Sequence, residues 1–258
     1  MYQHILFENS NGIVTITLNR PQVYNALNAA LLKEITRAFQ TAANDNSVRV
    51  VILTGEGKSF CSGADLKEAA ESGKTAGEIL EAYYNPMINA IRNIPKPVIC
   101  RLNGLAVGAG CSLALACDMV IASEDAYLSL LFVQIGLMPD AGVTFFLPRL
   151  VGMARAFELA TTGRRIYAPE AVSIGLIHGS VPAAELDKTV ADTAEYYLTA
   201  PTMAIGAIKQ VLNQSFHSDL TQMQRLEMIN QEKLFKSHDA IEGISSFLQK
   251  KKPDFQGK

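Results

Sequence analysis

The chain has 258 residues, of which 48% are hydrophobic and 19% are charged, and its formal net charge is −2. A chain of this length can bury a sizeable core, and its composition excludes an intrinsically disordered protein. The small net charge gives no reason to expect nucleic acid or an anionic membrane surface as a partner.

The first half of the chain alternates strand and helix patterns. No signal or transit pattern precedes the first strand, so a cytoplasmic protein is expected. The turn-forming residues Asn9, Ser10 and Asn11 predict a hairpin between the first two strands. Strands are predicted over residues 2–7, 12–18, 48–55, 97–104 and 119–123, and helices over residues 28–43 and 76–93. Apolar strands that alternate with helices indicate an α/β fold whose strands are buried on both faces.

The second half of the chain is chiefly helical from Ala168 onward. Apolar spacing and capping residues predict helices through Leu186 and Tyr197, through Ile205 and Leu212, after Ser218 or Asp219, and after Ser237. We therefore expect an α/β core with the ligand site over residues 1–200 and a helical C-terminal region over residues 201–258.

Cysteine and histidine usage gives no sign of a disulfide framework or a metal. The four cysteines lack CxxC spacing, and Cys111 and Cys117 lie in an apolar segment that is typical of a core in a reducing compartment. The four histidines are scattered and none pairs at ligand spacing, so no metal site is expected. No apolar run reaches membrane-spanning length without a polar break, so no membrane partner is expected.

Two turns that lead from a strand into a helix are rich in small residues. They read SFCSGADL at 59–66 and GLAVGAGCSLALACD at 104–118. Such turns leave backbone N–H groups unpaired at a helix N-terminus, where they suit a negative charge. Neither turn has the GxxxxGK[ST] pattern of a phosphate-binding loop, and GxGxxG does not occur. Small residues also allow close helix–strand packing, so for each turn alone both interpretations stay open.

Asp140 is the only charged residue between Asp125 and Arg149, in a mostly apolar stretch that includes LFVQIGLMPDAG at 131–142. Burying an isolated carboxylate costs several kcal/mol unless it is hydrogen-bonded or its pKa shifts. Three interpretations of Asp140 therefore stay open: a solvated turn residue, the cap of a helix that begins at Ala141, or an acid kept for chemistry.

Four motifs follow one another along the chain: NRPQVYNAL at 19–27, SFCSGADL at 59–66, NGLAVGAGCSLALACD at 103–118 and GLMPDAGVTFFLPRLVG at 136–152. In this order and at these separations they resemble the crotonase (enoyl-CoA hydratase/isomerase) superfamily over nearly the whole chain. The resemblance implies a spiral of ββα units with a C-terminal helical trimerisation region. It also implies acyl-CoA thioester substrates and homotrimers or hexamers. Coenzyme A is then part of the substrate, and no separate cofactor is expected.

In that superfamily, two backbone N–H groups hold the thioester oxygen as it becomes an enolate, and the resemblance places them on Ala64 and Ala109. Fixed donors aimed at developing negative charge can contribute several kcal/mol to catalysis. The further substrate-binding positions implied by the resemblance are Val23, Tyr24, Ala26, Ser62, Gly63, Asp65, Leu66, Leu105, Gly108, Phe132 and Pro139.

Hydratases of the superfamily carry two glutamates, whose positions match Ser112 and Phe132 in this chain. Neither residue can act as a carboxylate acid or base, which argues against hydration. An acid at the position of Asp140 is typical of the isomerases of the superfamily, including ring-modifying isomerases of phenylacetate breakdown. The resemblance thus favours an acyl-CoA isomerase with Asp140 as the proton shuttle.

Other functions stay open. The chain could be an enoyl-CoA hydratase if Ser112 and Phe132 are misaligned, although the nearest other acids are Asp118, Glu124 and Asp125. It could also be a non-catalytic protein that binds acyl-CoA. Covalent dehalogenation on this fold is disfavoured, because the chain has no tryptophan and no histidine between His4 and His178.

Overall fold

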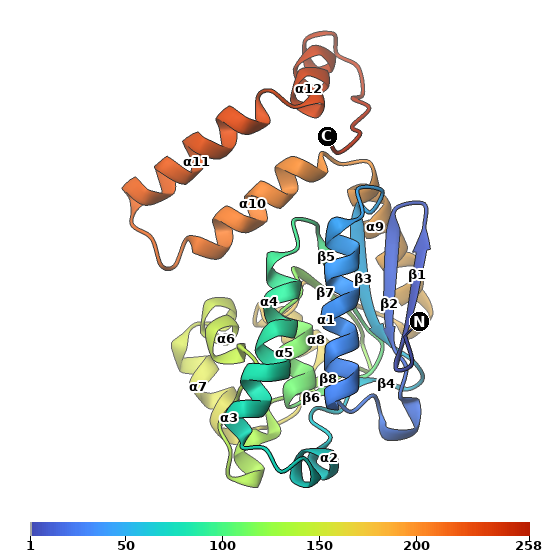
Figure 1. Cartoon of the computed structure of the whole chain (residues 1–258), viewed down its shortest axis with the longest axis vertical. Helices are drawn as coiled ribbons and strands as arrows, with labels where there is room; N and C mark the ends of the chain where they lie inside the picture. Colours follow the sequence, from blue (N-terminus) through green and yellow to red (C-terminus); the bar gives the residue numbers. More distant parts are fainter. Residues whose placement is uncertain (1) are drawn as a thin grey trace.

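The core of the protein is built from two β-sheets, as the computed structural model of residues 2–258 shows (Figure 1). Among these residues, the larger sheet has six strands in the order β1-β2-β3-β5-β7-β10, and the smaller sheet has four in the order β4-β6-β8-β9. The strands of the larger sheet are β1 Ile5–Ser10, β2 Ile13–Leu18, β3 Val50–Gly55, β5 Val98–Leu102, β7 Met119–Ser123 and β10 Gly179–Val181. The strands of the smaller sheet are β4 Ser59–Cys61, β6 Leu105–Val107, β8 Tyr127–Ser129 and β9 Ile166–Tyr167.

Successive strands alternate between the two sheets. The strands β3, β5 and β7 pair in parallel in the larger sheet, and each is followed by β4, β6 or β8 of the smaller sheet. A helical segment then leads back to the larger sheet, and the first two of these are α2 Leu66–Glu71 and α5 Ala109–Leu115. This repeat of two strands and a helix is the ββα spiral that the sequence predicts.

Helices cover both faces of the larger sheet. On one face, α1 Ala29–Asn44 buries Leu31, Ile35 and Phe39 in the main core, which it shares with α4 Asn85–Asn93 and α5. The side chain of Asn28 caps α1 by accepting a hydrogen bond of 2.9 Å from the Leu31 N–H. On the opposite face, α9 Leu186–Leu198 packs Val190 and neighbouring apolar residues against β3, β5 and β7.

The remaining helical segments connect these layers or lie at their edges. They are η1 Pro21–Val23, α3 Ala76–Ile79, the π-helical turn η2 Leu80–Tyr84, α4 Asn85–Asn93, η3 Leu131–Ile135, α6 Val143–Val151, α7 Met153–Thr162, α8 Ala168–Ser173 and η4 Ala183–Glu185.

Two sequence predictions about secondary structure were inaccurate. The first strand runs over Ile5–Ser10 rather than 2–7, because the chain reverses at Asn11 and Gly12, which both have positive φ. The predicted helix over 76–93 is three joined segments, with the π-helical turn between α3 and α4. The strands β4, β6, β8, β9 and β10 were not predicted, since runs of two or three residues show no periodicity.

Three helices follow the core: α10 Thr202–Gln214, α11 Leu220–Leu234 and α12 His238–Leu248. Figure 1 shows α11 and α12 (orange to red) extending away from the sheets, with α10 between them and the core. Asp219 and Ser237 cap α11 and α12, as predicted. The three helices and the turns between them expose Ile208, Leu212, Phe216, Leu220, Met228, Ile229, Phe235, Ile241, Ile244, Phe247 and Leu248. The role of residues 201–258 as a separate oligomerisation region stays a prediction. Of the helices in the described part of the chain, none combines the length and apolarity needed to cross a membrane.

Candidate active site

The two small-residue turns meet at Gly63. Its φ is +98°, and a Cβ atom on Gly63 would lie 2.8 Å from the Val107 carbonyl oxygen and 3.5 Å from the Ala109 nitrogen. Glycine is therefore required for the turns to approach this closely. On its other side, the first turn is held by Leu27, which donates to the Gly63 carbonyl over 2.7 Å and accepts from the Asp65 N–H over 2.9 Å.

Ala64 in the first turn and Ala109 in the second are among the residues whose backbone N–H groups have no acceptor in residues 2–258. The Ala64 N–H makes no hydrogen bond to any other residue between 2 and 258. Ala109 is the first residue of α5, where the N–H has no partner inside the helix, and no other described residue accepts from it. Gly63 thus brings together the two turns that present the free N–H groups of Ala64 and Ala109. This is the arrangement expected of an oxyanion hole.

An ion pair between Arg20 and Asp65 fixes the first of the two small-residue turns. The Arg20 Nη2 atom lies 3.0 Å from Asp65 Oδ2, and the two side chains are only 13% and 19% exposed. Arg20 also donates to the Ala26 carbonyl, and Asp65 caps α2 by accepting from the Glu68 N–H. Arg20 was not among the predicted site residues. Its place inside the NRPQVYNAL motif was the available signal.

The residues predicted to line a coenzyme A groove lie on these same segments. Val23 at the end of η1 and Tyr24 after it are exposed, and Leu66 is exposed at the start of α2. Ser62 joins the two segments, because its hydroxyl donates to the Val23 carbonyl over 3.3 Å. Ala26 is buried, so it offers little surface to a ligand.

Asp140 lies in the turn before α6 and does not cap that helix. The helix begins at Val143 with Gly142 as its N-cap residue, and no side chain caps it. The helix-cap interpretation of Asp140 is therefore wrong. The Asp140 Oδ1 atom is buried without a hydrogen-bond partner in the described part of the chain. Burial disfavours the charged carboxylate and raises the pKa of Asp140 to about 6.

Ser112 and Phe132, at the positions of the two hydratase glutamates, both lie close to the site. Ser112 is fully buried in α5, and its hydroxyl donates to the backbone carbonyl of Asp140 over 2.9 Å. Phe132 is buried in η3, and its Cζ atom lies 4.0 Å from the position of a Cβ on Gly108. The ring of Phe132 therefore lies beside the turn that carries the free Ala109 N–H. The other two predicted substrate-binding residues, Leu105 and Pro139, are half-buried.

Tyr84, at the end of the π-helical turn, approaches the site from a third direction. It is buried, its hydroxyl lies 3.5 Å from the Leu27 carbonyl oxygen, and it lines a small cavity with Asp65. Burial raises the pKa of Tyr84, and the negative charge of Asp140 raises it further. Tyr84 therefore remains a neutral hydrogen-bond donor near the candidate acid.

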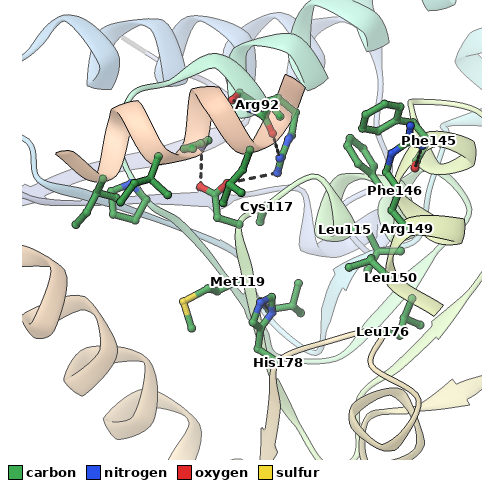
Figure 2. Close-up of a pocket in the computed structure, with 18 of the residues that line it drawn as sticks. Arg92, Leu115, Cys117, Met119, Phe145, Phe146, Arg149, Leu150, Leu176 and His178 are labelled. Atoms are coloured by element: carbon green, nitrogen blue, oxygen red, sulfur yellow. Dashed lines mark hydrogen bonds and ion pairs between the residues drawn. The ribbon is translucent and has the colours of Figure 1, made fainter. Parts of the chain in front are cut away.

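Asp118, one of the alternative acids, uses its carboxylate to hold α10 against the core. Its carboxylate contacts Arg92 and the buried Lys209 and accepts a hydrogen bond from the Val98 N–H. These interactions border a cavity of about 610 Å³ between α10 and the core (Figure 2). The wall of this cavity also holds Arg149, and residues 115, 117 and 118 at the end of the second small-residue turn border it, whereas Asp140 and residues 59–66 do not.

The site thus combines two free backbone donors with a carboxyl group whose pKa is close to neutrality. Two donors can stabilise an oxyanion, and a carboxyl with a pKa near 6 can take up and return a proton at physiological pH. This combination suits a reaction that passes through an enolate.

Known proteins resemble this chain over nearly all of its length. Residues 8–258 match the sequence model of the enoyl-CoA hydratase/isomerase family. A probable enoyl-CoA hydratase of Rhodobacter capsulatus is 41% identical over 100% of this chain and 99% of its own length. The 1,2-epoxyphenylacetyl-CoA isomerase of Escherichia coli is 38% identical over 100% of both chains. The crystal structure of an enoyl-CoA hydratase from Bacillus anthracis has a TM-score of 0.92 and 36% identity, over 99% of this chain and 100% of that one.

Proposed function

The chain belongs to the enoyl-CoA hydratase/isomerase family, the crotonase superfamily, and on this basis we propose that it is an acyl-CoA isomerase. It moves a carbon–carbon double bond, or rearranges a ring, next to the thioester of coenzyme A. The acyl-CoA brings its own coenzyme, so the reaction needs no further cofactor.

Asp140 is the proton shuttle of the proposed reaction. Its carboxylate removes a proton from a carbon of the acyl group, and the electrons of that C–H bond move toward the thioester carbonyl. The resulting enolate oxygen accepts hydrogen bonds from the N–H groups of Ala64 and Ala109. Asp140 then returns the same proton to a carbon two positions away. Atoms and charge balance over the cycle, because no other reactant is consumed.

The observation that carries this proposal is the unpartnered Asp140 carboxyl. A carboxylate that caps a helix or forms an ion pair has a lowered pKa and is a weak base. Asp140 makes neither interaction, and burial raises its pKa to about 6. With Ser112 and Phe132 at the two glutamate positions, Asp140 is the single acid left at the catalytic positions that the family motifs define.

Enoyl-CoA hydration is the second candidate function. The name of the Rhodobacter capsulatus relative, at 41% identity, favours it. Hydration requires a water molecule to be held and deprotonated, which the paired carboxylates of hydratases do. In this chain the buried Ser112 hydroxyl already donates its hydrogen bond to the Asp140 carbonyl, and the Phe132 ring has no polar atom to hold water. These contacts make isomerisation the better supported function.

The acyl group is proposed to be unsaturated or aromatic. The Phe132 ring beside the Ala109 turn offers an apolar wall for such a group. The name of the 38% identical isomerase from Escherichia coli points in the same direction, because its substrate carries a phenylacetyl group.

A homotrimer, or a hexamer of two trimers, is the proposed assembly. The apolar side chains exposed on α10, α11 and α12 would be costly to leave in water and are suited to a subunit interface. Sedimentation of the purified full chain tests this proposal, and a monomer at micromolar concentration would contradict it.

The deciding experiment offers the enzyme two substrates. A 3-enoyl-CoA gains ultraviolet absorbance when its double bond moves into conjugation with the thioester, whereas crotonyl-CoA loses absorbance when it is hydrated. We expect conversion of the 3-enoyl-CoA and, for Asp140→Asn, loss of that activity by ~10³-fold or more with acyl-CoA binding retained. Undiminished isomerisation by Asp140→Asn would overturn the proposal. Fast hydration of crotonyl-CoA would favour the hydratase, and tight binding without turnover would favour a non-catalytic acyl-CoA-binding protein.

A further inference from the structure

The turn that carries Asp140 has an unusual backbone. Ala141 has φ of +51° and is buried, and Gly142 follows with φ of +78°. Left-handed backbone is unfavourable for a residue with a Cβ atom, and it persists only when surrounding contacts hold it. The Asp140 side chain supplies no such contact, because its Oδ1 atom has no hydrogen-bond partner in residues 2–258.

The contact that holds this turn comes from α5. The fully buried hydroxyl of Ser112 donates to the Asp140 carbonyl over 2.9 Å. The only other donor to that carbonyl in the described chain is the Val143 N–H, at a longer 3.3 Å. The Ser112 hydrogen bond is therefore the stronger of the two that fix the Asp140 backbone.

Ser112 also lies in the helix that presents an oxyanion-hole donor. Ala109, with its free N–H, is three residues before Ser112 in the same short helix, α5. Residues three apart share a helix face. One rigid turn of helix thus carries the Ala109 N–H and the Ser112 hydroxyl, and so links the place where the oxyanion is held to the backbone of the proposed base.

We propose that Ser112 is a positioning residue for Asp140. Its hydrogen bond holds the strained turn at Asp140 and Ala141, keeps the Asp140 carboxyl free of protein partners, and sets the place of that carboxyl relative to the Ala109 N–H. The proposal deepens the proposed isomerase function and rests on it for its kinetic consequence.

Removal of the Ser112 hydroxyl leaves the Asp140 carbonyl with the long Val143 hydrogen bond alone. The turn then relaxes, and the carboxyl gains contact with water. Its pKa falls from about 6 toward the ordinary range of aspartate, near 4. Displacement of the base by about 1 Å is enough to lower kcat by ~10- to 100-fold, while KM stays within about twofold because the groove residues are unchanged.

The test compares Ser112→Ala with Ser112→Thr, which keeps the hydroxyl. The control is Thr54→Val, which removes a buried hydroxyl that donates to the Arg101 carbonyl over 3.0 Å in the larger sheet. The Asp140 carboxyl is titrated by NMR with carbon-13-labelled aspartate, and the Asp140→Asn spectrum identifies its signal. In the same proteins, kcat and KM for a 3-enoyl-CoA are measured against pH.

We expect Ser112→Ala to lower both the Asp140 pKa and kcat, Ser112→Thr to restore most of both, and Thr54→Val to change neither. A Ser112→Ala protein whose Asp140 still titrates near pH 6 would overturn the positioning role. The titration requires no turnover, so it decides the role of Ser112 even if the wild-type protein fails to isomerise any substrate. That failure would count against the proposed function alone.

Discussion

The Arg20 guanidinium lies 3.0 Å from the Asp65 carboxylate, and this ion pair joins residues 19–27 to the turn that carries the free Ala64 N–H. Both side chains are mostly buried, so their interaction is poorly screened by solvent. The pair holds in place a turn whose proposed oxyanion donor is a backbone nitrogen, which no side chain can position directly.

Arg20→Met is therefore expected to impair catalysis without touching the substrate's reacting carbons. It leaves the Asp65 charge unpaired, destabilises the protein by about 2–3 kcal/mol, and lowers kcat by ~10-fold through movement of the Ala64 N–H. The measurements are chemical denaturation and isomerase kinetics. The double variant Arg20→Met/Asp65→Asn should recover part of the stability, because the unpaired charge is gone. Strictly additive effects of the two substitutions would show that the ion pair has no such role.

Gly63→Ala should disrupt the contact between the two small-residue turns. The new Cβ atom would lie 2.8 Å from the Val107 carbonyl oxygen, and φ of +98° is unfavourable for alanine. We expect a loss of about 2–4 kcal/mol in the free energy of unfolding and near-complete loss of kcat. Gly73→Ala is the matched control, since its φ is also positive, at +67°, but its Cβ has no neighbour within 4 Å. Equal losses in the two variants would mean that backbone strain alone, and not the contact of the turns, explains the effect.

The residues of the candidate site could be predicted from the sequence better than the contacts between them. The motifs placed Ala64, Ala109 and Asp140 in turns, and the spacing of apolar residues predicted α1, β7 and the C-terminal helices closely. A periodic pattern is visible in sequence because it repeats every 3.6 residues in a helix or every two residues in a strand. The two-residue and three-residue strands of the smaller sheet are too short to repeat, and they were missed.

Contacts between distant residues were also invisible in the sequence. The Ser112 hydroxyl bonds a backbone carbonyl 28 positions away, and Arg20 pairs with a residue 45 positions away. Any carbonyl can accept a hydrogen bond, so no residue type at position 140 signals the first contact. Whether Asp140 caps a helix likewise depended on where α6 begins. The left-handed Gly142 excludes the cap, because it places the helix start at Val143.

The activity should depend on the ionisation of Asp140. The carboxylate is the form that removes a proton, and its pKa is raised to about 6 by burial. We therefore expect kcat/KM for a 3-enoyl-CoA to rise tenfold per pH unit well below pH 6 and to level off above about pH 7. A profile that is flat from pH 4.5 to 8 would contradict a base with this pKa.

The raised pKa of Asp140 also predicts how the stability of the folded protein depends on pH. A carboxyl whose folded pKa lies above its unfolded value, near 3.9, stabilises the folded state at low pH and loses that contribution as the pH rises to about 6. Asp140→Asn has no charge to bury, so its melting temperature should exceed that of the wild type above pH 6. The difference should shrink toward pH 4, where the wild-type carboxyl is protonated. Thermal unfolding at both pH values measures it, and a wild-type advantage at pH 7 would argue that the Asp140 carboxylate has a stabilising partner.

Lys209 anchors the C-terminal helices to the core. Its buried ammonium group donates to the carbonyls of Ile91 and Lys96 and lies 2.6 Å from the Asp118 carboxylate. Burial lowers the pKa of Lys209, and the charge of Asp118 opposes that shift. Because Lys209→Met leaves the two carbonyls and part of the Asp118 charge without a donor, we expect it to destabilise the protein by about 3 kcal/mol. Proteolysis should then cut the chain before α10 more rapidly than in the wild type.

Lys233→Met, on the exposed face of α11, is the control and should change neither measurement. Similar resistance of Lys209→Met and Lys233→Met to protease would mean that apolar packing, and not the buried ammonium group, holds α10 on the core.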